Sequence, residues 1–239
     1  MVRWVKDTTG RFPERPHYDP RELDADCEGY IEAFLRRRHG TVSYPIDTED
    51  LTVLLEDVVD ALDQYADLSE YGDEIHGVTE FHIRGKPVVR ISKDLTIEGY
   101  RSNRLRTTLT HELGHVRYHN FLWKMVGRRM TATVLRSASP RCHRSAIVSA
   151  SQGDWMEWQA AYACGAFLMP KTAVVSVIEH LLGTTSFKPI FAESVEGRQA
   201  VGAIHEAFQV SEEAARVRLY RLTLVTPGEP VATLFDSGP

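Results

Sequence analysis

The chain has few cysteines and no long apolar run. Its 239 residues include only three cysteines, Cys27, Cys142 and Cys164, which are widely spaced and form no C-x-x-C pair. This pattern excludes a disulfide framework and is typical of a reducing compartment, so we expect a cytoplasmic protein. Since 18 apolar residues never run together, we expect no transmembrane span. Residues 1–20 are polar and proline-containing, which is unlike a secretory signal.

The chain also lacks internal repeats, low-complexity tracts and a strong excess of one charge. Its net charge of −5 argues against a general grip on nucleic acid, so direct binding is not favoured. The stretch from Glu49 to Asp73 is acidic but lacks the spacing of a calcium loop. We therefore expect a solvated face there.

One motif carries the chemistry that the sequence suggests. His111, Glu112 and His115 form H-E-x-x-H, in a segment whose leucine spacing predicts a helix capped by Ser102 or Asn103. Histidines four residues apart share one helix face, where both imidazoles can bind one Zn²⁺ at about 2.0–2.1 Å. Glu112 lies about 100° around the helix, where a carboxylate can act as general base for a zinc-bound water.

Such a site needs a third protein ligand, and two residues compete for that role. Glu157 lies in a second predicted helix, which begins after Asp154, stops at Pro170 and is rich in alanine. Close packing of this small-sided helix favours Glu157 as ligand and predicts one zinc ion per chain. The alternative role of Glu157 is a capping box with Asp154. The rival ligand His119 lies two turns from His111, roughly 12 Å along the axis, and is less favoured.

A β-hairpin is predicted before the motif helix. The runs 75–83 and 87–91 are rich in β-forming residues, and residues 84–86 join them in a short turn. Its edge could accept an extended peptide as one more strand. His76 and His82 of this hairpin, with Tyr118 and His119, are candidates for a second oxyanion donor or a substrate contact. For the two hairpin histidines, a structural or surface role is the favoured interpretation.

Two further segments suggest interactions. Residues 121–153 are basic, poorly periodic and loop-like, so they could form a lid, a substrate-docking surface or a solvated insertion. Helices are predicted over 197–208 and from the N-cap Ser211 onward, and the turn between them is similar to a helix-turn-helix. The second of these helices mixes acidic residues with its arginines, which favours helix packing over DNA binding.

Three motifs taken together resemble the ImmA/IrrE family of metallopeptidases. They are H-E-L-G-H-x-x-x-H at 111–119, E-x-Q-A-x-x-A-x-x-x-x-L-M-P at 157–170 and F-x-V-S-x-x-A-x-x-x-R-L at 208–219. The resemblance implies a gluzincin-like peptidase in which His111, His115 and Glu157 bind zinc and Glu112 is catalytic. It also implies cleavage of a helix-turn-helix repressor, which relieves repression of a mobile element, a phage or a stress regulon.

We accordingly expect an α+β fold with a zincin-like helical core, a small antiparallel hairpin and a C-terminal helical segment. The expected parts are listed here in chain order: an N-terminal arm (1–19), a metallopeptidase domain (20–182), a helical segment (183–226) and a flexible tail (227–239).

The expected function is that of a zinc endopeptidase with a protein substrate and no membrane partner. The alternative is a zinc-containing regulatory module that acts on a transcription factor or on DNA without proteolysis. Glu112 argues against this alternative, because a purely structural zinc site requires no base.

Overall fold

The structure is a computed structural model, and it describes residues 3–72, 74–96, 102–129, 141–143, 154–186 and 188–227. The chain divides into two compact units, Met1–Leu168 and Met169–Pro239. The predicted metallopeptidase domain, residues 20–182, ends within the second of these units. Helices predominate and small sheets accompany them, which confirms the predicted α+β class. Among the described residues no single helix is long and apolar enough to cross a membrane. Helices α6 (Trp155–Leu168) and α7 (Lys171–Leu182) meet the length and composition criteria only when they are taken together as a bent pair.

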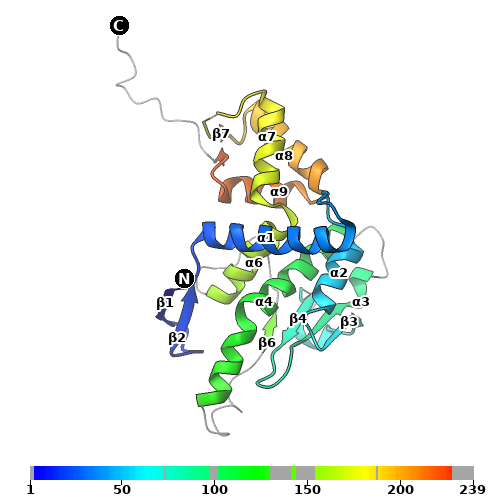
Figure 1. Cartoon of the computed structure of the whole chain (residues 1–239), viewed down its shortest axis with the longest axis vertical. Helices are drawn as coiled ribbons and strands as arrows, with labels where there is room; N and C mark the ends of the chain where they lie inside the picture. The colour runs from blue at the N-terminus through cyan, green and yellow to red at the C-terminus, as the bar shows by residue number, and fades with distance from the viewer. Residues whose placement is uncertain are drawn as a thin grey trace. The chain divides into compact units, whose positions relative to one another are not determined.

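The first unit holds the candidate site (Figure 1). Its elements are, in chain order, β1 (Arg3–Lys6), β2 (Glu14–His17), α1 (Pro20–His39), α2 (Thr48–Glu56), β3 (Ala61–Ala66), the 3₁₀ helix η1 (Ser69–Tyr71), β4 (Gly77–Glu80), β5 (Val88–Ser92), α3 (Lys93–Thr96), α4 (Ser102–Arg129), β6 (Arg141–His143) and α6 (Trp155–Leu168).

The N-terminal residues form a hairpin where the sequence predicted only an extended arm. Strands β1 and β2 pair antiparallel, and the connection between them inserts Phe12 into the core. Asp7 is buried beneath this connection and accepts hydrogen bonds from the backbone N–H of Phe12 (2.9 Å) and from Nε1 of Trp155 (3.1 Å). Burial raises the pKa of Asp7, but these donors and those of Thr9 outweigh burial and lower the pKa below 3.8. These long-range contacts order the arm, and nothing in the local sequence pattern indicates them.

The sheet has the strand order β3-β5-β4-β6. The predicted hairpin is confirmed as the antiparallel pair β4–β5. Strand β3 pairs parallel with β5, so the sheet is mixed rather than purely antiparallel. The prediction of only a solvated face missed β3, whose residues alternate between exposed and half-buried at the edge of the sheet.

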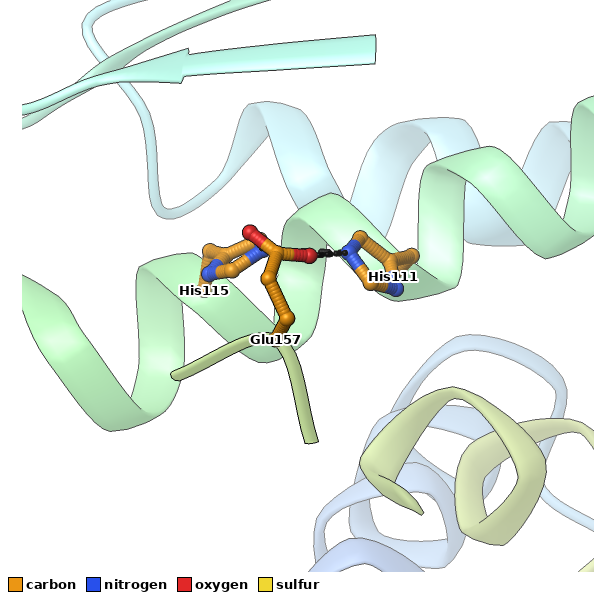
Figure 2. Close-up of side chains that lie close together, drawn as sticks. All are labelled: His111, His115 and Glu157. Carbon is orange, nitrogen blue, oxygen red and sulfur yellow. Dashed lines mark hydrogen bonds and ion pairs between the residues drawn. The ribbon is translucent and has the colours of Figure 1, made fainter. Parts of the chain in front are cut away.

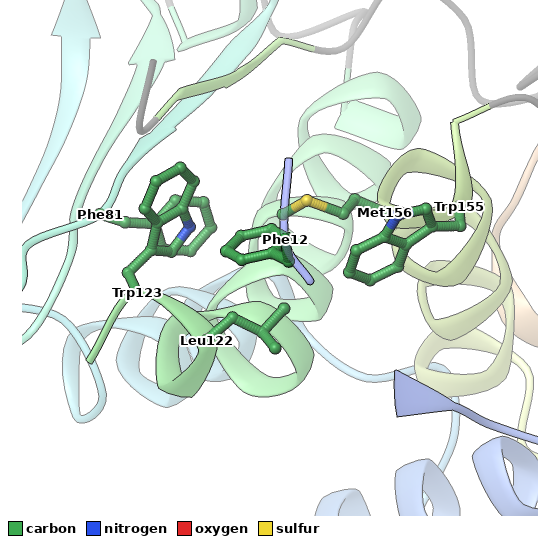
Figure 3. Packing of buried hydrophobic residues seen from close by; sticks show 6 residues of the cluster. All are labelled: Phe12, Phe81, Leu122, Trp123, Trp155 and Met156. Carbon is green, nitrogen blue, oxygen red and sulfur yellow. The ribbon is translucent and has the colours of Figure 1, made fainter. Parts of the chain in front are cut away.

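Helix α4 is longer than the sequence indicated, and it is the element on which the site is built. It includes both residues that were predicted as alternative caps, Ser102 and Asn103, and it continues through residues 121–129, which were predicted to be loop-like. Leu122 and Trp123 are buried in a cluster with Phe12, Phe81, Trp155 and Met156 (Figure 3). The ring of Trp123 stacks on Phe81, with the ring centroids 5.7 Å apart. Aromatic packing therefore stabilises the helix beyond the point where its apolar periodicity ends. Of residues 130–153, the structure describes only those of β6.

The boundaries of helices α1 and α2 follow local signals in the sequence. Helix α1 begins with a capping box between Asp19 and Glu22 and ends at Gly40, which has the left-handed φ of 75° that favours glycine. Helix α2 begins after Asp47, which occupies the N-cap position without a side-chain capping hydrogen bond.

The second unit is a small helical body with a two-stranded parallel sheet. Its elements are α7 (Lys171–Leu182), β7 (Ile190–Phe191), α8 (Val195–Phe208), α9 (Glu212–Arg221) and β8 (Val225–Thr226), and β7 pairs with β8. Ser211 caps α9 as predicted, but α9 ends at Arg221 because the chain turns there into β8. The predicted tail lies outside the described residues from position 228 onward.

Candidate metal centre

Helix α4 presents two imidazoles on one buried face. His111 and His115 are one turn apart, and their Nε2 atoms lie 3.0 Å from each other. Both side chains are almost fully buried, with 1% and 0% of their surface exposed. Two nitrogen donors therefore converge on one point, as the spacing in the sequence predicted.

Helix α6 brings a carboxylate to the same point (Figure 2). Oε2 of Glu157 lies 3.1 Å from Nε2 of His111, and its Oε1 lies 3.3 Å from Nε2 of His115. One donor atom from each of the three residues lies within 4.8 Å of the other two, so this group could hold a metal ion. Both oxygens of Glu157 face the histidines, which argues against a capping box as the role of this side chain.

Small residues make this convergence of helices geometrically feasible. A Cβ atom added to Gly114 would lie 3.0 Å from Cα and 3.2 Å from the carbonyl oxygen of Ala160, so the two backbones nearly touch there. The alanine-rich composition of the second helix predicted this close packing. Asp154 anchors the start of α6, because it accepts from the N–H of Met156 (3.2 Å) and forms an ion pair with Arg11 (2.6 Å).

The charge state of Glu157 suits a metal ligand. Burial raises the pKa of this carboxyl group, but the imidazoles of His115 and His111, when they are protonated in the metal-free site, outweigh burial and hold the pKa below its ordinary value of 4.5. The carboxylate is therefore ionised at neutral pH, as coordination of a cation requires.

Glu112 follows His111 in α4, and its carboxylate is held by strand β4. Its side chain is fully buried, and Thr79 Oγ1 donates a hydrogen bond of 2.5 Å to Oε2. A Cβ atom on Gly77 would lie only 2.5 Å from Oε1. Residues two apart on a strand face the same side of the sheet, so Gly77 and Thr79 both face the carboxylate of Glu112. Neither residue was predicted from the sequence, although a Gly-x-Thr pair in a predicted strand is the signal that could have identified them.

Tyr118 and His119 occupy different surroundings. The hydroxyl of Tyr118 donates to Oδ2 of Asp26 at 2.6 Å and lies 3.2 Å from Sγ of Cys27, both on α1, so it is directed away from the metal group. His119 is not one of the three donors. Its Nδ1 lies 3.0 Å from Nδ1 of His115, on the side of that ring opposite the nitrogen that faces Glu157.

The two hairpin histidines, His76 and His82, are not among the three metal donors. His76 immediately precedes Gly77, so its backbone lies next to the carboxylate of Glu112, and its carbonyl accepts from the N–H of Ser92 at 2.9 Å. His82 is exposed in the connection between β4 and β5. For both residues, a contact with substrate stays a prediction.

The hairpin edge that was expected to be free is paired in the structure. Strand β6 joins β4 antiparallel, with Cys142 opposite Thr79 and Arg141 opposite Glu80. This strand comes from the basic stretch 121–153, whose three suggested roles did not include a strand of the sheet. The chain itself thus places an extended segment next to the strand that contacts Glu112.

Comparison with known proteins adds no identification. No family model matches the chain, and no curated protein matches it significantly.

Proposed function

We propose that this protein is a cytoplasmic zinc endopeptidase of the ImmA/IrrE type, which cleaves a helix-turn-helix repressor and so relieves repression. The observation that carries the proposal is the position of Glu112. It is a buried carboxylate on the residue that follows His111, and it is not one of the donors of the His111, His115 and Glu157 group. A structural site would use its acids as ligands or omit them, whereas a hydrolytic site needs a base.

The donor set fits zinc. Two imidazoles and one carboxylate are the ligands of a catalytic zinc site, which keeps its fourth position for water or substrate. When bound, zinc supplies Lewis-acid chemistry, because it lowers the pKa of a coordinated water to about 7 and polarises a carbonyl group.

The residues of the chain have distinct tasks in the proposed reaction. His111, His115 and Glu157 would hold the ion. Glu112 accepts a proton from the attacking water and then gives it to the amine of the leaving product. Thr79 holds one oxygen of this carboxylate and so keeps it aligned with the reacting atoms.

The sheet favours a substrate segment in extended conformation. Because β4 carries the residues next to Glu112, a peptide paired with β4 would run past the base. We expect such a peptide to take the position that β6 holds in the structure. A flexible segment of a repressor would meet this requirement, since it can extend along a strand.

A cleavage assay tests the proposal. Zinc-loaded wild type and Glu112→Gln are incubated with the helix-turn-helix repressor encoded nearest to its gene and with a peptide library from a digested proteome. Mass spectrometry then identifies new N-termini. We expect cuts by wild type and at least about 10²-fold slower cutting by Glu112→Gln, which should still retain zinc. Equal cutting by the two proteins would refute the role of Glu112. Binding of the repressor without cleavage would favour the regulatory module.

A further inference from the structure

A buried hydrogen-bond chain begins on the far side of His115. Nδ1 of His115 lies 3.0 Å from Nδ1 of His119, and Nε2 of His119 lies 3.1 Å from Oε1 of Gln159. Nε2 of Gln159 donates to the carbonyl oxygen of Pro16 at 3.0 Å. Both histidines and Gln159 expose at most 1% of their surface. The chain therefore connects α4, α6 and β2 without access to solvent.

The last link sets the direction of every other hydrogen bond. The carbonyl oxygen of Pro16 can only accept, so the amide nitrogen of Gln159 faces it and the amide oxygen faces His119. That oxygen also only accepts, so Nε2 of His119 carries a hydrogen. In a neutral imidazole the other nitrogen then accepts, and Nδ1 of His115 must be the donor.

This direction leaves Nε2 of His115 without a hydrogen. That nitrogen is the one that faces His111 and Glu157, so its lone pair is free for a metal ion. Two aromatic neighbours pack against the ring of His119. Trp155 meets it edge-on with the ring centroids 5.5 Å apart, and the centroid of the His115 ring lies 5.1 Å away. Partners of this kind, behind a metal-binding histidine, typically change metal affinity by 10–100-fold.

We propose that His119 and Gln159, anchored on the carbonyl of Pro16, are positioning residues that fix His115 in the tautomer that binds metal through Nε2. This inference rests on the metal site of the proposed function. It also assigns a role to the N-terminal hairpin, because Pro16 of β2 supplies the group that orients the chain.

Two measurements test the inference. The first is zinc affinity, measured by competition with a chromophoric chelator, for wild type, His119→Phe, His119→Gln and Gln159→Leu. We expect about 10–100-fold weaker binding for His119→Phe, a loss in the same direction for Gln159→Leu, and partial recovery for His119→Gln, which keeps an acceptor oxygen. Adding Gln159→Leu to His119→Phe should cost little more than His119→Phe alone, because both break one chain.

The control variant is Leu122→Ala, which removes a buried side chain of α4 outside the hydrogen-bond chain. It should lower stability to urea and leave zinc affinity within about twofold, since Leu122 is neither a ligand nor a hydrogen-bond partner of a ligand. Zinc affinities of His119→Phe and Gln159→Leu equal to wild type would overturn the inference while leaving the metal site in place. The inference would also be overturned if Leu122→Ala lost as much zinc affinity as His119→Phe and Gln159→Leu, because a general loss of packing would then explain all three results.

The second measurement does not depend on zinc. Imidazole ¹⁵N shifts of the metal-free protein, recorded at a pH at which His115 is neutral, report the tautomer of this residue directly. We expect a hydrogen on Nδ1 in wild type and a mixture of tautomers in His119→Phe. A hydrogen on Nε2 of His115 in wild type would overturn the inference, whether or not zinc binds. Failure to bind zinc, with the expected tautomer present, would count against the proposed function alone.

Discussion

Gly77→Ala should impair the general base Glu112 and leave zinc binding by the metal group unchanged. The new Cβ atom would lie 2.5 Å from Oε1 of Glu112 and 2.8 Å from Cγ2 of Thr108. An ordinary contact needs about 3.4 Å or more, so Oε1 of Glu112 must move by roughly 0.9 Å from the new Cβ atom. The hydrogen bond from Thr79 holds the other oxygen of Glu112, which limits how the carboxylate can turn away.

The expected magnitude follows from this displacement. A misplacement of about 1 Å at a reacting group can cost about 10²-fold in rate, which corresponds to about 2.7 kcal/mol of barrier. Zinc affinity should stay near that of wild type, because Glu112 is not one of the three donors. Gly77 has no left-handed backbone angle, so alanine should not strain the strand itself.

The assay compares cleavage rate, zinc affinity and urea unfolding for Gly77→Ala and for a matched variant, Gly29→Ala. A Cβ atom on Gly29 in α1 would meet nothing within 4 Å, so that variant should keep full activity and gain up to about 1 kcal/mol of stability. Wild-type cleavage by Gly77→Ala would refute the assignment of Glu112 as a base held against β4. Loss of zinc along with activity would refute the separation of base and ligands.

Two other substitutions test packing and charge. Gly114→Ala should cost about 1–2 kcal/mol in urea unfolding, since overpacking against the backbone of Ala160 exceeds the gain in helix propensity, and it should weaken zinc binding; a more stable protein with unchanged affinity would contradict this. Asp7→Asn should destabilise the protein at neutral pH. Because folding lowers the pKa of Asp7 below 3.8, the contribution of its carboxylate is present above that pH and is lost as the pH falls through the lowered pKa. The stability difference between wild type and variant, measured by urea unfolding across pH, should shrink accordingly; a constant difference would refute it.

The metal group was predictable because each part of it has a local signal. The i, i+4 spacing of His111 and His115 is a property of the helix itself. Glu157 is found by the cap at Asp154 and by the small side chains that follow it. These signals act over a few residues, and they stay valid whatever the rest of the chain does.

The surroundings of the group depend on contacts that no local pattern encodes. Thr79 reaches Glu112 across 33 positions, and Gln159 reaches Pro16 across 143. The pairing of β6 with β4 joins segments more than 60 positions apart. Helix α4 likewise runs past its apolar stripe because Trp123 stacks on Phe81. Burial and register decide these features, so they become visible only once the chain is folded.

The most direct test is zinc content by plasma mass spectrometry, on reconstituted wild type, Glu157→Ala and the control Glu49→Ala. Glu49 is an exposed carboxylate outside the site, so its removal should not affect the metal. We predict one zinc per chain in wild type and in Glu49→Ala, and loss or strong weakening in Glu157→Ala. Full zinc retention by Glu157→Ala would remove this residue from the site, and a wild type that binds no zinc would contradict the proposed metallopeptidase.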